Sequence, residues 1–147
     1  MKILVSNDLS DLSKPVVDEA AKLARAMGGE LTLLHVVRCE AAPPDSGKEL
    51  LPPGDLWERE TELREVATAL EKDGLKVDAV VKLTAGAVYE SVVHEAGERG
   101  AAMIVCGSHG RGKMFELLVG STTQGLIRTS PVPVLVVTGL ESVPAIG

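Results

Sequence analysis

The sequence predicts a single α/β domain built on an open, doubly wound parallel sheet of five strands with helices on both faces. Short β-branched apolar runs alternate with segments of helical periodicity, and this alternation requires parallel strands joined by right-handed crossovers. The runs TLLHVV, MIVC and VLVV are almost continuously apolar, which is typical of strands covered on both faces. The length of 147 residues suits one hydrophobic core, so one domain is expected over 1–147.

The first half of the chain begins with the strand KILVS at residues 2–6. Ser13 is expected to be the N-cap of the first helix, with a proline in its first turn and Gly28 after its last turn. ELTLLHVV at 30–37 predicts the second strand. Residues 39–55 contain four prolines and no periodicity, which indicates an irregular loop.

The second helix is expected within WERETELREVATALEKDG, with apolar residues on one face and charges on the other. Gly74 would cap it, and Leu75 is placed for the hydrophobic contact of a Schellman motif. The remaining expected elements are the strand KVDAVVKL (76–83), a helix over 87–99, the strand AAMIVCG (101–107), a helix over 121–128 and the strand PVPVLVVT (131–138), followed by a tail at 139–147.

Composition excludes several classes of protein. The formal net charge is −6 at pH 7, which argues against a nucleic-acid partner. No apolar run approaches the roughly 18 residues that span a bilayer, and the N-terminal segment lacks the apolar region of a secretion signal, so no membrane partner and a cytoplasmic location are expected. Cys39 and Cys106 have no C-x-x-C spacing and are expected to be free thiols.

Two polar loops follow strands of the predicted sheet, NDLSD after the first and GSHGRG after the fourth. The carboxyl ends of parallel strands share one edge, where ligands bind in open α/β sheets. Gly107, Gly110 and Gly112 permit close approach of the backbone to a ligand, so that consecutive amides can form an anion nest. The helix expected to start at Ser121 and Thr122 adds free N–H groups and hydroxyls.

Two familiar nucleotide motifs do not match this stretch. Gly107-x4-Gly112-Lys113 is followed by Met114, where a P-loop needs Ser or Thr for magnesium. Phe115 stands where a dinucleotide fingerprint needs its third glycine. A loop whose glycines only make turns is the alternative to a phosphate site.

The pattern that matches is Gly107-x2-Gly110-x9-Gly120-Ser121. With ILVSND, LTLLHVV, MIVCGSHGRG and LLVGSTTQGLIRTSPVPVLVV, the chain resembles the nucleotide-binding branch of the universal stress protein family over nearly its whole length. The resemblance implies an adenine nucleotide, ATP or else ADP or AMP, with magnesium as an optional companion. It also implies a dimeric stress-response sensor or adaptor, whereas an interaction module of the same fold without nucleotide is the alternative.

The resemblance also implies a set of site residues. Those that would hold the phosphates are Gly107, Gly110, Gly120, Ser121 and Thr122, with Ser108, His109 and Arg111 in the same loop. Asp8 would face the ribose or adenine, although an Asx turn would also explain it without any ligand. Val36 would offer backbone groups to the adenine. Asn7 departs from the small or apolar residue usual in the family.

The resemblance further implies a homodimer formed by pairing of the fifth strand, at about 132–138, with its two-fold mate. The histidine spacing gives no metal motif, so no metal site is expected. His35 is expected to be hydrogen-bonded and partly buried in its strand, and His94 to lie at the surface or in an interface. No residue stands out as a general base or nucleophile, so any ATP hydrolysis or autophosphorylation is expected to be weak.

Overall fold

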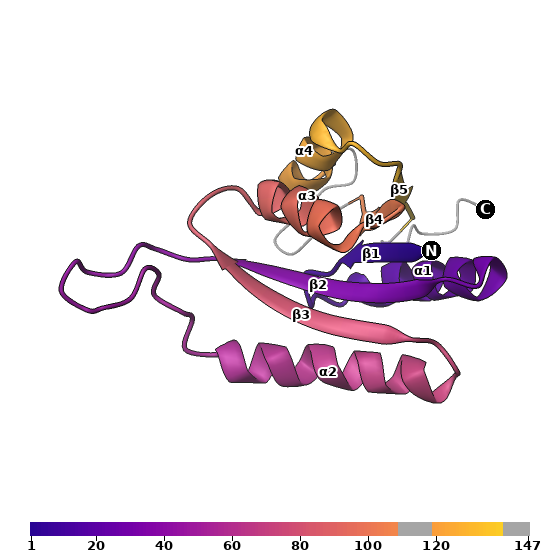
Figure 1. The fold of residues 1–147 in the computed structure, drawn as a ribbon, viewed down its shortest axis with the longest axis horizontal. Helices are drawn as coiled ribbons and strands as arrows, with labels where there is room; N and C mark the ends of the chain where they lie inside the picture. Colours follow the sequence, from indigo (N-terminus) through magenta and orange to yellow (C-terminus); the bar gives the residue numbers. More distant parts are fainter. Residues whose placement is uncertain (109–118, 140–147) are drawn as a thin grey trace, which may run out of the picture.

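The computed structural model describes residues 1–108 and 119–139. Within these ranges the strands form one parallel sheet of five in the order β3-β2-β1-β4-β5 (Figure 1), which confirms the predicted fold class. In chain order the elements are β1 Lys2–Ser6, α1 Ser13–Met27, β2 Glu30–Arg38, α2 Leu56–Lys72, β3 Val77–Thr84, α3 Val88–Arg99, β4 Met103–Gly107, α4 Ser121–Thr129 and β5 Val134–Val137.

Two layers of helices enclose the sheet. Alternate residues of a strand face opposite sides, so Ile3 and Val5 of β1 pack with α1 and α2, whereas Leu4 packs with α3 and α4. Figure 1 shows α2 and α3 on opposite sides of β2 and β3. The winding reverses at β1, because β2 and β3 lie on one side of it and β4 and β5 on the other. The carboxyl ends of β1 and β4 therefore flank the switch point of the sheet.

The end of α2 follows the predicted Schellman pattern. Gly74 adopts a φ of 91°, which is accessible to glycine at little cost. Its N–H donates to the Glu71 carbonyl oxygen at 3.0 Å, and the Leu75 N–H donates to the Leu70 carbonyl oxygen at 3.3 Å. Leu70 and Leu75 are both buried in the core beneath α2, so this cap directs the chain straight into β3.

The N-cap predicted for α1 is wrong by one position. The cap is Leu12, which makes no side-chain capping bond, and Ser13 is the first helical residue. The Ser13 hydroxyl instead donates to the Ser10 carbonyl oxygen at 2.7 Å, because a turn that begins at Ser10 immediately precedes the helix. The last strand is also shorter than predicted, since prolines at 131 and 133 remove two backbone donors before Val134.

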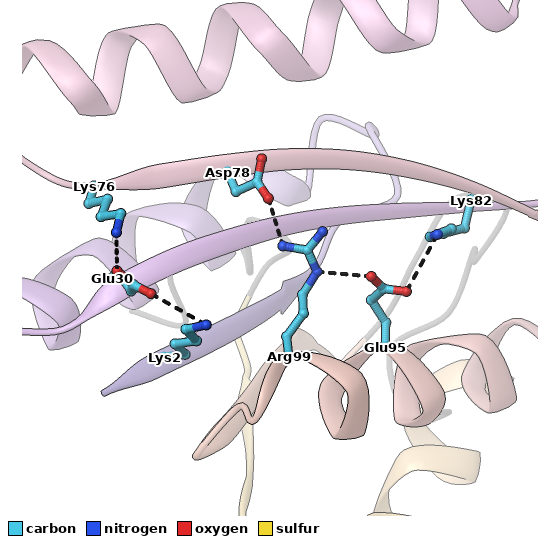
Figure 2. Close-up of polar contacts among 7 residues, drawn as sticks. All are labelled: Lys2, Glu30, Lys76, Asp78, Lys82, Glu95 and Arg99. Atoms are coloured by element: carbon cyan, nitrogen blue, oxygen red, sulfur yellow. Dashed lines mark hydrogen bonds and ion pairs between the residues drawn. The ribbon is translucent and has the colours of Figure 1, made fainter.

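Charged side chains connect β3 to α3 on the face of the sheet that α3 covers (Figure 2). The Arg99 guanidinium contacts Asp78 of β3 at 2.6 Å and Glu95 of α3 at 2.9 Å. Lys82 lies 3.8 Å from the same Glu95 carboxylate, which is only 8% exposed. Because Arg99 contacts a carboxylate of β3 and one of α3 at the same time, it holds α3 against the edge strand of the sheet.

The stretch at residues 39–55 projects away from the sheet (Figure 1). It contains neither helix nor strand, but Ala41 and Leu50 form an antiparallel bridge across it. None of the helices in the described ranges is long and apolar enough to cross a membrane. Residues 140–147, which make up most of the expected tail, lie outside the described residues.

Candidate functional site

A pocket of about 220 Å³ opens at the carboxyl ends of β1, β2 and β4. It contains six of the ten predicted site residues, namely Asp8, Val36, Gly107, Gly120, Ser121 and Thr122. Ser108 lies beside it, buried in the chain between Gly107 and the loop that follows. The predicted residues His109, Gly110 and Arg111 lie outside the described residues. The pocket therefore brings together segments more than 100 positions apart in the chain.

The start of α4 contributes backbone donors to this pocket. Its N-cap is Gly120, with φ −61° and ψ 155°, and no side chain caps the helix. The N–H groups of the first helical turn have no acceptor within the helix, and they carry the positive end of its dipole. Ser121 and Thr122 line the pocket at this point, so the site offers both amide and hydroxyl donors to an anion.

Hydrogen bonds connect this helix start to the end of β4. The Ser108 carbonyl oxygen accepts the Gly120 N–H at 2.9 Å, and the Ser108 N–H donates to the Val137 carbonyl oxygen at 2.9 Å. The Thr123 hydroxyl donates to the Gly107 carbonyl oxygen at 2.6 Å. These bonds place the two ends of the glycine-rich stretch side by side.

The second strand presents backbone groups to the pocket at Val36. Pairing between β1 and β2 ends at Ser6 and Leu34, and Val36 lies two residues further along β2. Alternate residues of a parallel strand direct their N–H and C=O groups to the same neighbouring strand. Leu34 directs its carbonyl oxygen to Asn7, so the N–H and C=O of Val36 face the same side, where β1 has already ended. Val36 therefore lines the pocket with backbone groups that β1 does not pair.

Asp8 lies at the pocket and also closes an Asx turn. Its Oδ1 accepts the Ser10 N–H at 3.0 Å and the Ser10 hydroxyl at 2.7 Å. The Asx turn that would explain Asp8 without a ligand is therefore present. The same turn holds the carboxylate on the pocket wall. The two interpretations of Asp8 are compatible in this structure.

Several pocket residues were not predicted to belong to the site. Thr123, Cys106, Leu12, Ser13, Val16 and Val88 all line it. Thr123 directly follows the predicted Ser121 and Thr122, and that adjacency was the one available signal. The Cys106 thiol is free and buried, and burial raises its pKa despite a hydrogen bond to Thr123, so it lines the pocket as a neutral group.

The two described histidines lie as expected. His35 is 4% exposed, and its Nδ1 lies 2.8 Å from the Asn7 carbonyl oxygen. His94 is exposed on α3, 4.0 Å from Glu98. Across residues 1–108 and 119–139, the structure brings together no group of three or more histidine, cysteine, aspartate or glutamate side chains able to hold a metal ion.

Fold and pocket together define an open, doubly wound α/β domain with a polar site at the point where the strand order reverses. The model of the universal stress protein family matches residues 1–138. The chain belongs to the universal stress protein family.

Individual relatives agree with this assignment. The chain is 31% identical to the universal stress protein YxiE of Bacillus subtilis, over 92% of this chain and 97% of the relative. It is also 31% identical to the universal stress protein MJ0577 of Methanocaldococcus jannaschii, over 92% and 93%. The solved structure of MJ0577 superposes on this chain with a TM-score of 0.77 and a sequence identity of 25%. The match covers 96% of this chain and 97% of the MJ0577 chain.

A third comparison concerns a solved complex. The universal stress protein of Archaeoglobus fulgidus in complex with dAMP has a TM-score of 0.69 at 22% identity, and the match covers 92% of this chain and 96% of that one. At this identity the likeness extends to the fold.

Proposed function

We propose that this chain binds an adenine nucleotide, with ATP as the foremost candidate, and acts as a stress-response sensor or adaptor rather than as a fast enzyme. The observation that carries the proposal is the uncapped start of α4 at the switch-point pocket. A helix N-terminus with free amides favours phosphate groups. The dAMP complex of the Archaeoglobus fulgidus protein of the same fold supports an adenine nucleotide.

The chemistry of the pocket lining supports an orientation for the nucleotide. Gly120, Ser121 and Thr122 would provide donors for the phosphates, with Gly107 beside them in the pocket. The lining from α1, β2 and α3 is largely apolar, through Leu12, Val16, Val36 and Val88, and suits the flat face of a base. Asp8 would then accept hydrogen bonds from the ribose or adenine, and a magnesium ion would accompany a triphosphate.

Slow hydrolysis is part of the proposal. The described pocket residues include no histidine, and the Asp8 carboxylate already accepts two bonds from Ser10. No side chain among them is placed to activate a water molecule as a general base would. We expect any turnover of ATP to stay below about 1 per second, at the bottom of the usual enzyme range.

Mass spectrometry of freshly purified, denatured protein tests the nucleotide directly, and ATP, ADP or AMP is expected. Saturation with ATP and magnesium at 100 times the dissociation constant should then stabilise the fold by about 2.7 kcal/mol. If no bound nucleotide is found and adding ATP leaves unfolding unchanged, these results would favour the alternative, an interaction module of the same fold.

A glycine substitution tests the placement of the phosphates. Gly120→Val should abolish ATP binding in calorimetry while the fold remains, because φ and ψ at Gly120 suit any L-residue and the branched side chain would occupy the pocket. The matched control is Gly97→Val on α3, where an added Cβ meets nothing within 4 Å. Equal affinity of Gly120→Val and Gly97→Val for ATP would remove the phosphates from this end of the pocket.

We also propose a homodimer through β5 in the cytoplasm, which is the arrangement expected for an adaptor. β5 is an edge of the sheet, so one row of its backbone groups has no strand partner within the described sheet. Leu135 of β5 is 37% exposed and Ile127 of the adjacent α4 is 58% exposed. Pairing of two such edges about a two-fold axis would cover both the backbone groups and the apolar side chains.

A further inference from the structure

The turn that follows β1 is conformationally strained. Leu9 has a φ of 59° and is the one non-glycine residue with positive φ among those that the structure describes. A left-handed conformation is unfavourable for such a residue, because its Cβ comes too close to the following carbonyl oxygen. Strain of this kind persists only where the surroundings hold it, and it is concentrated at functional sites. Leu9 directly follows Asp8, which lies on the pocket wall.

Asn7 holds this turn against β2. Its N–H donates to the Leu34 carbonyl oxygen at 2.8 Å, and its own carbonyl oxygen lies 2.8 Å from His35 Nδ1. The Asn7 side chain accepts the Leu9 N–H at 2.8 Å, which fixes the residue in its strained conformation. Asn7 is 4% exposed, so these bonds form away from competing water.

His35 connects this turn to α2 through a contact with Arg59. Its Nε2 lies 3.1 Å from Nη1 of Arg59. A guanidinium can only donate, so Nε2 accepts and the ring proton is on Nδ1, which donates to the Asn7 carbonyl oxygen. Arg59 is held in turn by Asp55, whose Oδ1 lies 2.9 Å from Arg59 Nε. A continuous chain of hydrogen bonds therefore runs from the start of α2 to the turn at the pocket.

We propose that Arg59 and His35 are positioning residues for the nucleotide, although Arg59 does not line the pocket. They hold the strained turn and with it Asp8, so the start of α2 sets nucleotide affinity from outside the site. The inference rests on the proposed nucleotide function.

The test compares two arginines on one helix. Arg59→Met removes the donors and keeps much of the aliphatic stem, and Arg64→Met makes the same charge change at an exposed position of α2. Loss of one charge-assisted hydrogen bond should weaken ATP binding by about 5–10-fold in Arg59→Met, whereas Arg64→Met should stay close to the original protein. Equal affinity in the two variants would overturn the positioning role and leave the proposed function intact.

A second pair of variants separates positioning from general stability. His35→Asn keeps an amide N–H near the position of Nδ1 and can still donate to Asn7, whereas His35→Gln places its amide near Nε2 and loses that bond. Because His35→Asn also loses the Nε2 acceptor of Arg59, each of the two histidine variants breaks the chain of hydrogen bonds at one place. In nucleotide-free protein, hydrogen exchange of the Leu9 and Ser10 amides should therefore be faster in His35→Gln, His35→Asn and Arg59→Met than in Arg64→Met.

The amide measurements do not depend on nucleotide binding. If the unmodified protein binds no ATP, ADP or AMP, the proposed function fails, and the exchange rates then decide only whether Arg59 and His35 hold the turn. Unchanged exchange at Leu9 and Ser10 in Arg59→Met would then overturn it. Faster exchange at these two amides, with the remaining protected amides unaffected, would support it.

Discussion

Thr123 and Asn7 illustrate how single polar residues build the pocket. Both are almost fully buried, and both bind backbone groups at or shortly after the end of a strand. Thr123 binds the carbonyl oxygen of Gly107, and Asn7 binds the amide of Leu9. Buried polar groups are nearly always paired in folded proteins, and here the pairing sets the course of both loops beside the site.

Thr123→Val tests the first of these bonds. The change keeps the shape of the side chain but leaves the Gly107 carbonyl oxygen without its 2.6 Å donor. The free energy of unfolding should fall by about 1–2 kcal/mol in urea denaturation, because a buried acceptor loses its partner. Thr122→Val is the control, since Thr122 is less buried. Equal losses in the two variants would contradict a special role for Thr123.

At the scale of secondary structure, the position of α4 depends on its close contact with α3. An added Cβ at Gly125 would overlap the Tyr89 ring at Cγ, Cδ1 and Cε1. Gly125 therefore lets α4 approach α3 closely enough for the ring to pack against its backbone. The start of α4 reaches the pocket from this packed position, so the contact between the helices contributes to the geometry of the site.

Gly125→Ala should destabilise the protein, contrary to the usual effect of alanine in a helix. Alanine is favoured over glycine by up to about 1 kcal/mol, but overpacking against Tyr89 should cost about 1–3 kcal/mol. The control is Gly97→Ala on α3, where an added Cβ meets nothing within 4 Å, and which should be neutral or stabilising. Thermal or urea unfolding measures both, and stabilisation by Gly125→Ala would refute the close-packing argument.

The ion pairs between β3 and α3 should make stability depend on pH. The hydrogen bond from Arg99 holds the pKa of Asp78 below its ordinary value of 3.8. A lowered pKa means that the contribution of Asp78 is fully present above the unfolded pKa and is lost as the pH falls through the lower folded value. The stability difference between the original protein and Asp78→Asn should therefore be largest near neutral pH and shrink in acid.

The control for this pH dependence is the same Asp78→Asn change in an Arg99→Met background. Without the guanidinium, the carboxyl should titrate near its ordinary value, so the difference between the two proteins should vary much less with pH. Urea denaturation across the acid range measures both pairs. If the pH dependence remains after Arg99 is replaced, it must come from groups other than the Asp78–Arg99 pair.

At the scale of the whole molecule, the sheet leaves two edges, β3 and β5. The β3 edge lies beside the Asp78 and Lys82 ion pairs (Figure 2), and such charges discourage strand pairing. The β5 edge has the sequence VLVV and is apolar. This asymmetry makes β5 the edge better suited to a second copy of the chain.

Leu135→Lys should therefore convert the proposed dimer into a monomer, because an ammonium group on β5 would be placed in the paired interface. Light scattering after size-exclusion chromatography at micromolar concentration would measure the mass. Leu51→Lys is the control, a leucine of similar exposure, 43% against 37%, in the loop far from β5 (Figure 1). A monomeric mass for the original protein, or a dimeric mass for Leu135→Lys, would contradict pairing through β5.

The resemblance to a known family implied six residues that line the pocket. Local patterns in the sequence were enough to predict the strand and helix order and the Schellman cap at Gly74. These features depend on contacts close along the chain or on rules for parallel sheets. The position of Ser13 in α1 was not predictable in this way. Its hydroxyl donates to the Ser10 carbonyl oxygen in the preceding turn, so it does not cap the helix.

The contacts that organise the site depend on segments far apart in the chain. His35 reaches Asn7 across 28 positions, and Arg59 reaches His35 across 24. No periodicity or motif records such a pairing, because it forms only after crossovers have brought β1, β2 and α2 together. Pattern and composition thus specify which elements form and where their loops converge, whereas the hydrogen bonds between those loops are set by packing of the folded chain.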